Sequence, residues 1–496
     1  MTITIDEMAT FCKKKGLIFP NSELYGGVAG VFDYGPLGVE LKSNIKAAWW
    51  RYHVQQRDDV VGIDGAILAS PRVWKASGHV DSFTDVLVEC EKCHSRHRAD
   101  TLVEDATRKP ADGMKPADLD AAITDHAIVC PKCKGLLGKA RPFNLMFTTH
   151  IGPTVDENVA YLRPETAQLI FADFKAVNDI GRVKLPFGIA QMGKAFRNEI
   201  SPRNFLFRCR EFEQMELEYF VHPTEQSCPY LQEVKDYRLL ILDTDAQAKE
   251  TGAIVRSMGE ALEKGIIKTE WHAYWLAMEH QWFVSLGVRP ENLRIRQHLA
   301  DEKSHYALDT WDLEYNFPFG WKELQGMANR TDFDLSQHAK ESGKDLAIFD
   351  EATQQKVVPH VIAEPSQGVE RAFLVFLYEA YRDDKERGNV VLALHPRLAP
   401  IKAAIFPLLK NKPELVALAE QVHHELRAIM PTQLDSSGSI GRRYARADET
   451  GVPFCVTIDF DSIESKDVTV RDRDSTEQVR VPIAKLRQWL LEKVLV

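Results

Sequence analysis

The sequence predicts an α/β protein whose larger part is an α+β core, an antiparallel sheet flanked by helices, followed by a smaller C-terminal α/β domain. Two extended runs, 189–199 and 211–220, flank a loop with Pro202 and Asn204, a pattern typical of an antiparallel hairpin. From residue 388 onward strand-like and helix-like segments alternate, which favours a separate domain with a largely parallel sheet. A chain of 496 residues also exceeds what one core usually organises, so two or three domains are expected.

Composition is that of an ordinary globular protein. The chain is 44% hydrophobic and 27% charged, and no apolar run reaches the roughly 18 residues that would span a membrane. The N-terminus shows no secretory signal, and eight cysteines, four of them in CxxC pairs, fit a reducing cytoplasm. We therefore expect a cytoplasmic protein without a membrane partner. A formal net charge of −10 argues against a wholesale polyanion binder but permits local basic patches.

The hairpin carries charge where a buried strand would not. Because side chains alternate along a strand, Arg197 and Glu199 share one face of the first arm, and Phe212, Glu216 and Glu218 share one face of the second. The arms thus offer a cation, carboxylates and an aromatic ring to one pocket. A solvated hairpin at a sheet edge is the simpler interpretation of this pattern in isolation, and the remaining motifs decide against it.

The hairpin resembles motif 2 of the class II aminoacyl-tRNA synthetases. The resemblance rests on FRNE at 196–199, on REFE at 210–213 and on the loop arginines Arg203 and Arg208; QMELEYF at 214–220 is similar to the homodimeric glycyl-tRNA synthetases. The physical logic agrees with this resemblance. Activation of an amino acid needs a cation where charge develops on the α-phosphate, a task suited to Arg197. Adenine needs a flat platform and a polar edge, which Phe212 and Arg208 supply.

The N-terminal segments resemble motif 1, the dimer element of this class. Residues 5–17 have weak helical spacing, and the glycine-rich stretch 21–38 matches no phosphate-binding loop, so we interpret it as a packed turn region. An amphipathic helix is predicted over 39–53, and a strand over 65–71 ends in Pro71. The resemblance implies a homodimer.

Two CxxC pairs predict a metal site within an insertion that spans 85–140. The four thiols are Cys90, Cys93, Cys130 and Cys133. Two such turns can present four thiolates to one tetrahedral zinc ion, and a four-thiolate site leaves no open position, so its role is structural. Reduced thiols at chance spacing are the alternative, and His94 and His97 are competing ligands.

Two further segments between these motifs resemble substrate-binding parts of the glycyl enzymes. Arg98 lies in an HRAD-like segment, and the resemblance implies that it approaches the substrate. Glu165 lies in RPETAQ at 163–168, before a helix that starts near Thr166. Glu165 as a simple helix-start acid is the alternative to the role that the resemblance implies, which is to bind the ammonium group of the substrate.

Residues 222–296 show helical patterning without a catalytic motif. We interpret this stretch as a helical insertion that reaches toward the acceptor stem of tRNA. Its tryptophans, Trp271, Trp275 and Trp282, are expected to form its core and not to stack on nucleic acid.

Two more motifs complete the catalytic set. In 321–328, alternation puts Glu323 on one side of a strand, and the resemblance assigns it to magnesium on the ATP phosphates; an acid paired with an arginine is the alternative. EPSQGVER at 364–371 enters a helix and resembles motif 3. Arg371 falls in the first helical turn, where its charge opposes the macrodipole unless a phosphate is bound. The resemblance places Arg371 on the γ-phosphate and Glu364 and Ser366 in the glycine pocket.

The C-terminal part, 388–496, resembles the anticodon-binding domain that follows the catalytic domain, 1–387, in this class. We predict a strand over 390–394, then helices and strands that end in a helix over 482–495. The basic stretch 441–446 suits an RNA backbone and one splayed base, with a solvated basic loop as the alternative.

The resemblance covers almost the whole chain and implies ATP-dependent attachment of glycine to tRNA(Gly) through glycyl adenylate, with release of AMP and pyrophosphate. It assigns catalysis to Arg197, Glu323 and Arg371. The residues expected to bind substrate are Arg98, Glu165, Phe212, Glu213, Gln214, Met215, Glu216, Glu364, Pro365, Ser366, Gln367 and Gly368. The residues expected to bind ATP are Arg197, Asn198, Glu199, Phe207, Arg208, Cys209, Arg210, Glu211, Phe212, Glu323, Leu324, Gly368, Val369, Glu370 and Arg371.

Two alternatives stay open at this point. One is a related ligase with another amino-acid specificity, such as prolyl or threonyl. The other is a synthetase-like nucleic-acid-binding subunit without catalysis. Such a subunit would not need Arg197, Glu323 and Arg371 together, and this sequence has all three.

Overall fold

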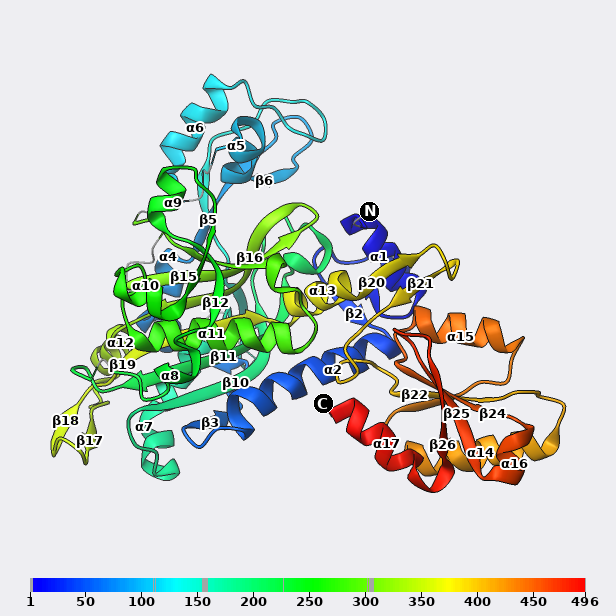
Figure 1. Cartoon of the computed structure of the whole chain (residues 1–496). Helices are drawn as coiled ribbons and strands as arrows, with labels where there is room; N and C mark the ends of the chain where they lie inside the picture. The colour runs from blue at the N-terminus through cyan, green and yellow to red at the C-terminus, as the bar shows by residue number, and fades with distance from the viewer. Residues whose placement is uncertain are drawn as a thin grey trace.

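The chain folds around a nine-stranded sheet, with a smaller α/β domain at its C-terminal end (Figure 1). The computed structural model describes residues 3–109, 111, 113–153, 159–225, 227–300, 302 and 307–495. No described helix combines the length and the apolar character that a membrane crossing requires.

The large sheet is mostly antiparallel, in the order β13-β12-β14-β15-β16-β19-β11-β10-β3. Among the described strands of this sheet, only the pairs β10–β3 and β12–β14 are parallel. Its strands are β3 Val60–Ile63, β10 Phe187–Phe196, β11 Glu211–Val221, β12 Arg238–Leu242, β13 Ile254–Ser257, β14 Leu293–Gln297, β15 Asp309–Phe317, β16 Gly320–Asn329 and β19 His360–Gly368. The predicted antiparallel core flanked by helices is confirmed.

The predicted hairpin is the pair β10–β11, in register from Phe187 opposite Phe220 to Phe196 opposite Glu211. The two faces of β11 pack in different clusters because alternate residues of the strand point in opposite directions. Met215, Leu217, Tyr219 and Val221 enter the main core. Phe220, on the other face, packs in a second cluster with Phe171 and Phe174. The face with Phe220 is therefore the one that also carries Glu216 and Glu218.

Helices cover the core face of the sheet. The main ones are α2 Pro36–Trp50, α11 Glu270–Ser285 and α13 Val369–Ala380. On the opposite face lie α7 Ala167–Gly181 and α12 Phe333–Ser342, which pack against one end of the hairpin. This arrangement leaves the other end of the hairpin uncovered by helices on that face.

The prediction of a purely helical segment over 222–296 is wrong. The segment contributes β12, β13 and β14 to the edge of the large sheet, between the short helices α8 Leu231–Val234, α9 Thr244–Ala248 and α10 Met258–Glu263. The longest described helix of the segment is α11, in which Trp271, Trp275 and Trp282 are each at most 1% exposed. The prediction that these tryptophans lie in the core is confirmed. The strands β12, β13 and β14 were not predicted because each spans only four or five residues, too few for a clear alternation pattern.

The N-terminal segment also differs in detail from its prediction. Helix α1 Ile5–Lys14 precedes the small sheet β1 Ile18–Pro20 with β2 Phe32–Tyr34. The strand that follows α2 in the large sheet is β3, whereas Pro71 is the first residue of α3 Pro71–Ala76 and lies outside any strand. Proline suits a first helical position because that residue needs no N–H donor.

The cysteine-bearing insertion projects from the sheet at the top of Figure 1. It holds a three-stranded sheet, β6 Arg96–Arg98, β5 Thr84–Glu89 and β7 Arg141–Asn144, with α5 Ala99–Thr107 and α6 Pro116–Asp125. Further short elements are α4 His79–Ser82, β4 Leu68–Ala69, β8 Phe147–His150, β9 Val159–Leu162, β17 Ile348–Asp350 and β18 Gln355–Val357.

The C-terminal domain has its own sheet, in the order β23-β22-β24-β25-β26. Its elements are β22 Ala403–Pro407, α14 Pro413–Arg427, β23 Thr432–Leu434, α15 Ile440–Glu449, β24 Phe454–Ile458, α16 Phe460–Ser465, β25 Asp467–Asp472, β26 Gln478–Pro482 and α17 Ile483–Leu495. The sheet is mixed and not largely parallel, because β24–β25 and β25–β26 are antiparallel. The predicted strand at 390–394 is β21 Asn389–Leu392, which pairs with β20 Tyr381–Asp384 outside this sheet.

Candidate functional site

A cavity of about 210 Å³ opens on the uncovered face of the sheet, between the motif 2 hairpin, β16 and the start of α13. Thirteen of its lining residues were predicted from the sequence: Arg197, Glu199, Phe207, Arg208, Cys209, Phe212, Gln214, Glu323, Leu324, Ser366, Gly368, Glu370 and Arg371. The fourteenth is Leu206. Segments more than one hundred residues apart in the sequence thus form one site, and the three predicted catalytic residues line the same space.

Arg197 is held between two aromatic rings. Its Cζ atom lies 5.4 Å from the ring centroids of Phe83 and of Phe212, and its Nε donates to the carbonyl oxygen of Pro164 at 3.1 Å. A guanidinium between rings loses little orientational freedom when it binds an anion. Sequence reasoning missed Phe83, which lies outside every motif and gives no signal of its own.

Arg371 and Glu323 form an ion pair at the other wall of the cavity. Arg371 Nη1 lies 3.0 Å from Glu323 Oε1, and the Arg371 guanidinium lies 4.5 Å above the ring of Phe207. The positive charge of Arg371 lowers the pKa of Glu323, whose side chain is 48% exposed. Glu323 is therefore an ionised oxygen donor at an open wall, which fits a hard cation, although its present partner is the arginine.

Arg98 is not among the residues that line this cavity. Its guanidinium pairs with Asp85 at 2.7 Å and with Asp100. Burial, partly offset by Arg98 and reinforced by Glu199, raises the pKa of Asp85 to about 6. Arg208, which does line the cavity, lies 3.6 Å from Glu199. The charge of Arg98 thus affects Asp85 and, in the cavity lining, Arg208.

Four residues predicted to bind ATP do not line the cavity. Arg210 donates to the backbone oxygens of Glu199 and Ala29, and so holds the loop in place. Glu211 pairs with Lys194, Val369 is buried in the core, and the backbone of Asn198 bonds to Leu145. Any contact of these residues with ATP stays a prediction.

Four residues predicted to bind substrate are absent from the lining for a common reason. Glu213, Met215, Pro365 and Gln367 alternate along their strands with Gln214, Glu216, Ser366 and Gly368. Met215 is in the core, and Glu213 is paired with Lys42 at 2.7 Å. The face that carries Gln214 and Ser366 is the one that opens to the cavity.

A cluster of carboxyl groups lies below Gln214 and Ser366, which hydrogen-bond to each other at 3.2 Å. The N–H of Thr166 donates to Glu216 at 3.1 Å, and Arg330 Nη1 donates to Glu364 at 2.7 Å. Glu165 receives a hydrogen bond from Gln168 and pairs with His79 at 3.3 Å. The predicted residues Glu165, Glu216, Glu364 and Ser366 are thus brought together.

Burial dominates the electrostatics of this cluster. It raises the pKa of Glu216, and it raises the pKa of Glu364 to about 8 even though Arg330 opposes the shift. Burial also acts on Glu165, but the charges of His79 and Arg330 prevail and lower its pKa. A desolvated group of carboxyls that includes the ionised Glu165 is suited to receive a small cation.

Arg330 was not predicted and is the main cation of this cluster. It bonds both Asp334 at 2.6 Å and Glu364, and its only signal in the sequence is its place directly after β16. Its two carboxylate partners fix its orientation.

The four predicted metal ligands form one cluster in the insertion. The Sγ atoms of Cys90 and Cys133 are 3.4 Å apart, those of Cys93 and Cys130 are 3.7 Å apart, and all four lie within 4.8 Å of one another. Four thiolates at the usual Zn–S distance of about 2.3 Å are separated by roughly 3.8 Å, so the donor set fits zinc. His97 bonds to Ser95 and Cys130 from outside the cluster, and His94 to Glu89.

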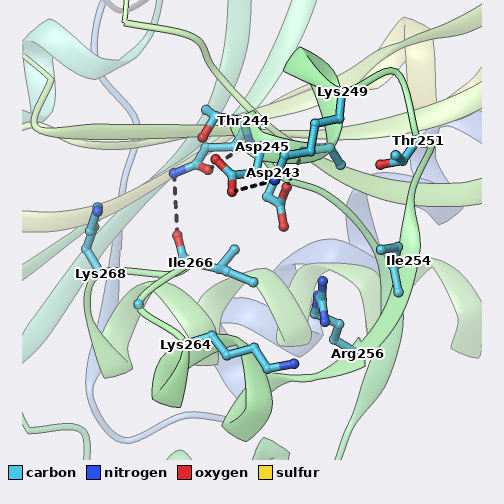
Figure 2. A pocket seen from close by; sticks show the side chains of 13 residues that line it. Asp243, Thr244, Asp245, Lys249, Thr251, Ile254, Arg256, Lys264, Ile266 and Lys268 are labelled. Carbon is cyan, nitrogen blue, oxygen red and sulfur yellow. Dashed lines mark hydrogen bonds and ion pairs between the residues drawn. The ribbon is translucent and has the colours of Figure 1, made fainter.

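A larger cavity than the one at Arg197 lies elsewhere. It measures about 550 Å³, is bordered by α9, β13 and the end of α10, and includes Asp243, Arg256 and Lys264 (Figure 2). It contains none of the predicted site residues. Size alone therefore does not identify the functional site.

In the C-terminal domain, the basic stretch 441–446 lies on a helix and not in a loop. Arg443 is 2% exposed and donates to the backbone oxygens of Pro407 and Leu408. Tyr444 bonds Thr457. The side chains of Arg443 and Tyr444 thus bond within the domain, whereas Arg442 is exposed.

Comparison with known proteins agrees with this geometry. Residues 147–380 match the tRNA synthetase class II core domain (G, H, P, S and T), and residues 402–493 match the anticodon binding domain. The glycine–tRNA ligase of Caldanaerobacter subterraneus subsp. tengcongensis is 45% identical over 501 residues, which cover 99% of both chains. That of Geobacillus kaustophilus is 45% identical over 504 residues, which cover 100% of both chains. The chain therefore belongs to the glycine–tRNA ligase family of the class II aminoacyl-tRNA synthetases.

Proposed function

We propose that the protein attaches glycine to tRNA(Gly) in an ATP-dependent reaction through glycyl adenylate, with release of AMP and pyrophosphate. The single observation that carries the proposal is the cavity in which Arg197, Glu323 and Arg371 face the same space as Ser366, directly above the carboxyl cluster. The family membership of the chain supports the same reaction.

The first step is in-line attack of the glycine carboxylate on the α-phosphate. Negative charge grows on the phosphate oxygens, and Arg197, preoriented by two aromatic rings, is placed to stabilise it. Phe212 provides the surface for the adenine, and Arg371 receives the terminal phosphates. No side-chain nucleophile is required, so the rate derives from positioning and from charge stabilisation.

Magnesium is the cation that ATP brings, and Glu323 is the residue that would hold it. A magnesium ion would neutralise phosphate charge. Glu323 is ionised and half exposed in the cavity lining, and Arg371 would exchange its ion pair with Glu323 for the phosphates.

Selection of glycine rests on charge and exclusion. The ammonium group is attracted to Glu165, Glu216 and Glu364, while Ser366 bounds the site above them. A pocket with no room for a Cβ atom rejects every larger amino acid, so glycine is selected without a further recognition element.

The remaining assignments rest on the sequence resemblance and on separate observations. We propose structural zinc at the four clustered cysteines, tRNA contact by the C-terminal domain and a cytoplasmic location. A homodimer is proposed because the chain before and within α2 exposes Leu24, Tyr25, Val28 and Val39 by 47% or more. Light scattering coupled to size-exclusion chromatography tests it, and a monomer at all concentrations contradicts it.

The test of the reaction is amino-acid-dependent exchange between ATP and pyrophosphate, with magnesium and without tRNA, for all twenty amino acids. Exchange with glycine alone, followed by glycine transfer to tRNA(Gly), supports the proposal. Exchange with another amino acid retains the class and overturns the glycine pocket. No exchange from folded, metal-loaded protein favours a nucleic-acid-binding subunit.

A further inference from the structure

Glu218 is a carboxyl group without a hydrogen-bond partner among the described residues. Its side chain is 0% exposed, and neither of its oxygens accepts or donates a hydrogen bond. The register that pairs Glu216 with Ser366 and Tyr219 with Ala363 places Glu218 opposite Glu364. One oxygen of each of the three glutamates lies within 4.8 Å of the others. An unpartnered buried carboxyl in such a group requires an explanation.

Most of the described charges around Glu218 are carboxyl groups, and the charge of Arg330 only partly offsets their effect on its pKa. Glu216 faces it from the same strand and Glu364 from β19, while Arg330 is already bonded to Glu364 and to Asp334. Burial and the neighbouring charge of Glu364 raise the pKa of Glu218 well above its ordinary value. Three adjacent ionised carboxylates in a desolvated space repel one another strongly, so the group retains at least one proton.

We propose that Glu218 is a positioning residue of the ammonium site that remains a neutral carboxylic acid, so that its hydroxyl group faces Glu216 and Glu364 and limits the negative charge there. This inference rests on the proposed function, because it assumes that the cluster receives the ammonium group of glycine. Glu216 and Glu364 contact the substrate, and Glu218 acts through them. A neutral Glu218 stabilises the ionised forms of Glu216 and Glu364 as a polar neighbour. It adds no further negative charge, which a single ammonium group could not balance.

The chain offers a matched pair of substitutions for the test. Glu216 and Glu218 are the same residue type, lie two positions apart on β11 and share its pocket-facing side. Glutamine has nearly the shape of a neutral glutamic acid and cannot ionise. Glu218→Gln is therefore expected to be mild, whereas Glu216→Gln removes a charge that binds substrate.

The readout is glycine-dependent exchange between ATP and pyrophosphate, with KM determined separately for glycine and for ATP. We expect the KM for glycine to stay within about threefold of the wild type in Glu218→Gln and to rise at least tenfold in Glu216→Gln. The KM for ATP is expected to change in neither variant.

A third variant separates positioning from mere packing. Glu218→Leu removes both unpartnered oxygens and keeps much of the side-chain volume. Removal of an unsatisfied buried polar group should leave Tm unchanged or raise it. We nevertheless expect the KM for glycine to rise about tenfold, because Glu216 and Glu364 lose their polar neighbour. A residue with only a structural role would move Tm alone.

Two results would overturn the inference. If Glu218→Gln weakens glycine as much as Glu216→Gln does, Glu218 is ionised and binds the ammonium itself. If Glu218→Leu keeps the wild-type KM for glycine, Glu218 has no role in the site. A wild-type protein that shows no glycine-dependent exchange overturns the proposed function instead, and this inference falls with it.

Discussion

The ATP half of the cavity is built from arginines beside aromatic rings, whereas the half beneath Ser366 is built from carboxyl groups. Arg197 lies between Phe83 and Phe212, and Arg371 lies over Phe207. These guanidiniums keep their charge in any of these surroundings. Glu216 and Glu364 instead have raised pKa values because they are buried. The ATP half is thus permanently charged, and the charge of the glycine half depends on pH and on occupancy.

The first prediction concerns the permanent charge. Arg197→Ala should lower glycine-dependent exchange by about 10³-fold, because the cation that meets the developing phosphate charge is lost. Arg197→Lys should recover only part of that loss, since an ammonium does not stack between rings as a guanidinium does. The control is Arg72→Ala, a surface arginine that is 64% exposed and pairs with Glu341. Equal activity of Arg197→Ala and the control would remove Arg197 from the chemistry.

The second prediction concerns the carboxyl half. Glu364→Gln should raise the KM for glycine by about 10- to 100-fold and leave the KM for ATP within twofold, because the ammonium loses a charged partner and Glu364 is not among the residues that line the ATP half. Initial rates of exchange at varied glycine and at varied ATP measure both constants. A parallel rise of the two KM values would show that the halves are not separable.

The third prediction concerns the titration of the Glu364 carboxyl group. The pKa of Glu364 rises from an ordinary 4.5 to about 8 in the folded chain. The folded state therefore binds the proton more tightly, and the free energy of unfolding falls as pH rises from about 4.5 to 8. In Glu364→Gln this contribution is absent. Without glycine, the Tm of the variant minus that of the wild type should increase between pH 5 and pH 8.

The control for this titration is Glu263→Gln, because Glu263 is exposed. The Tm difference for the control should stay flat over the same interval. A flat difference for Glu364→Gln as well would mean that Glu364 is already ionised at pH 5, contrary to the burial argument.

The smallest effect on exchange is expected from the metal site. Cys130→Ser should abolish stoichiometric zinc and lower Tm by several degrees, while exchange changes by less than about tenfold, because the cluster lies outside the cavity. Metal analysis, calorimetry and exchange rates measure the three quantities. Cys228→Ala, at a cysteine outside the cluster, should retain the metal. Loss of exchange to the level of Arg197→Ala would make the metal part of the chemistry.

The resemblance to motifs 2 and 3 predicted most of the lining of the ATP half, and alternation along β11 adds that Phe212, Gln214 and Glu216 share a face. The same alternation, applied to 213–216 and 364–368, would also have excluded Glu213, Met215, Pro365 and Gln367 from the cavity. The resemblance assigned these four residues to the substrate-binding site together with their neighbours. Alternation of side chains along a strand removes them from the cavity lining.

Other features lay beyond local sequence reasoning. Phe83 reaches Arg197, and Arg330 reaches Glu364, through tertiary packing that no periodicity encodes. The strands β12 to β14 were not predicted because their own sequence patterns are short. Pairing with neighbouring strands stabilises them in the sheet. In α15, Arg443 belongs to the basic stretch that the sequence marks as suited to RNA, but its side chain donates to backbone carbonyls of its own domain.

Strand β11 has a consequence for how this chain can change in length. Its odd-numbered residues 215–221 build the main core, and its even-numbered residues 216 and 218 stand in the carboxyl cluster. Substitutions on one face can accumulate without disturbing the other. A single inserted or deleted residue would exchange the two faces, drive glutamates into the core and turn apolar side chains toward the substrate. The length of this strand should therefore tolerate no change, even where its individual residues do.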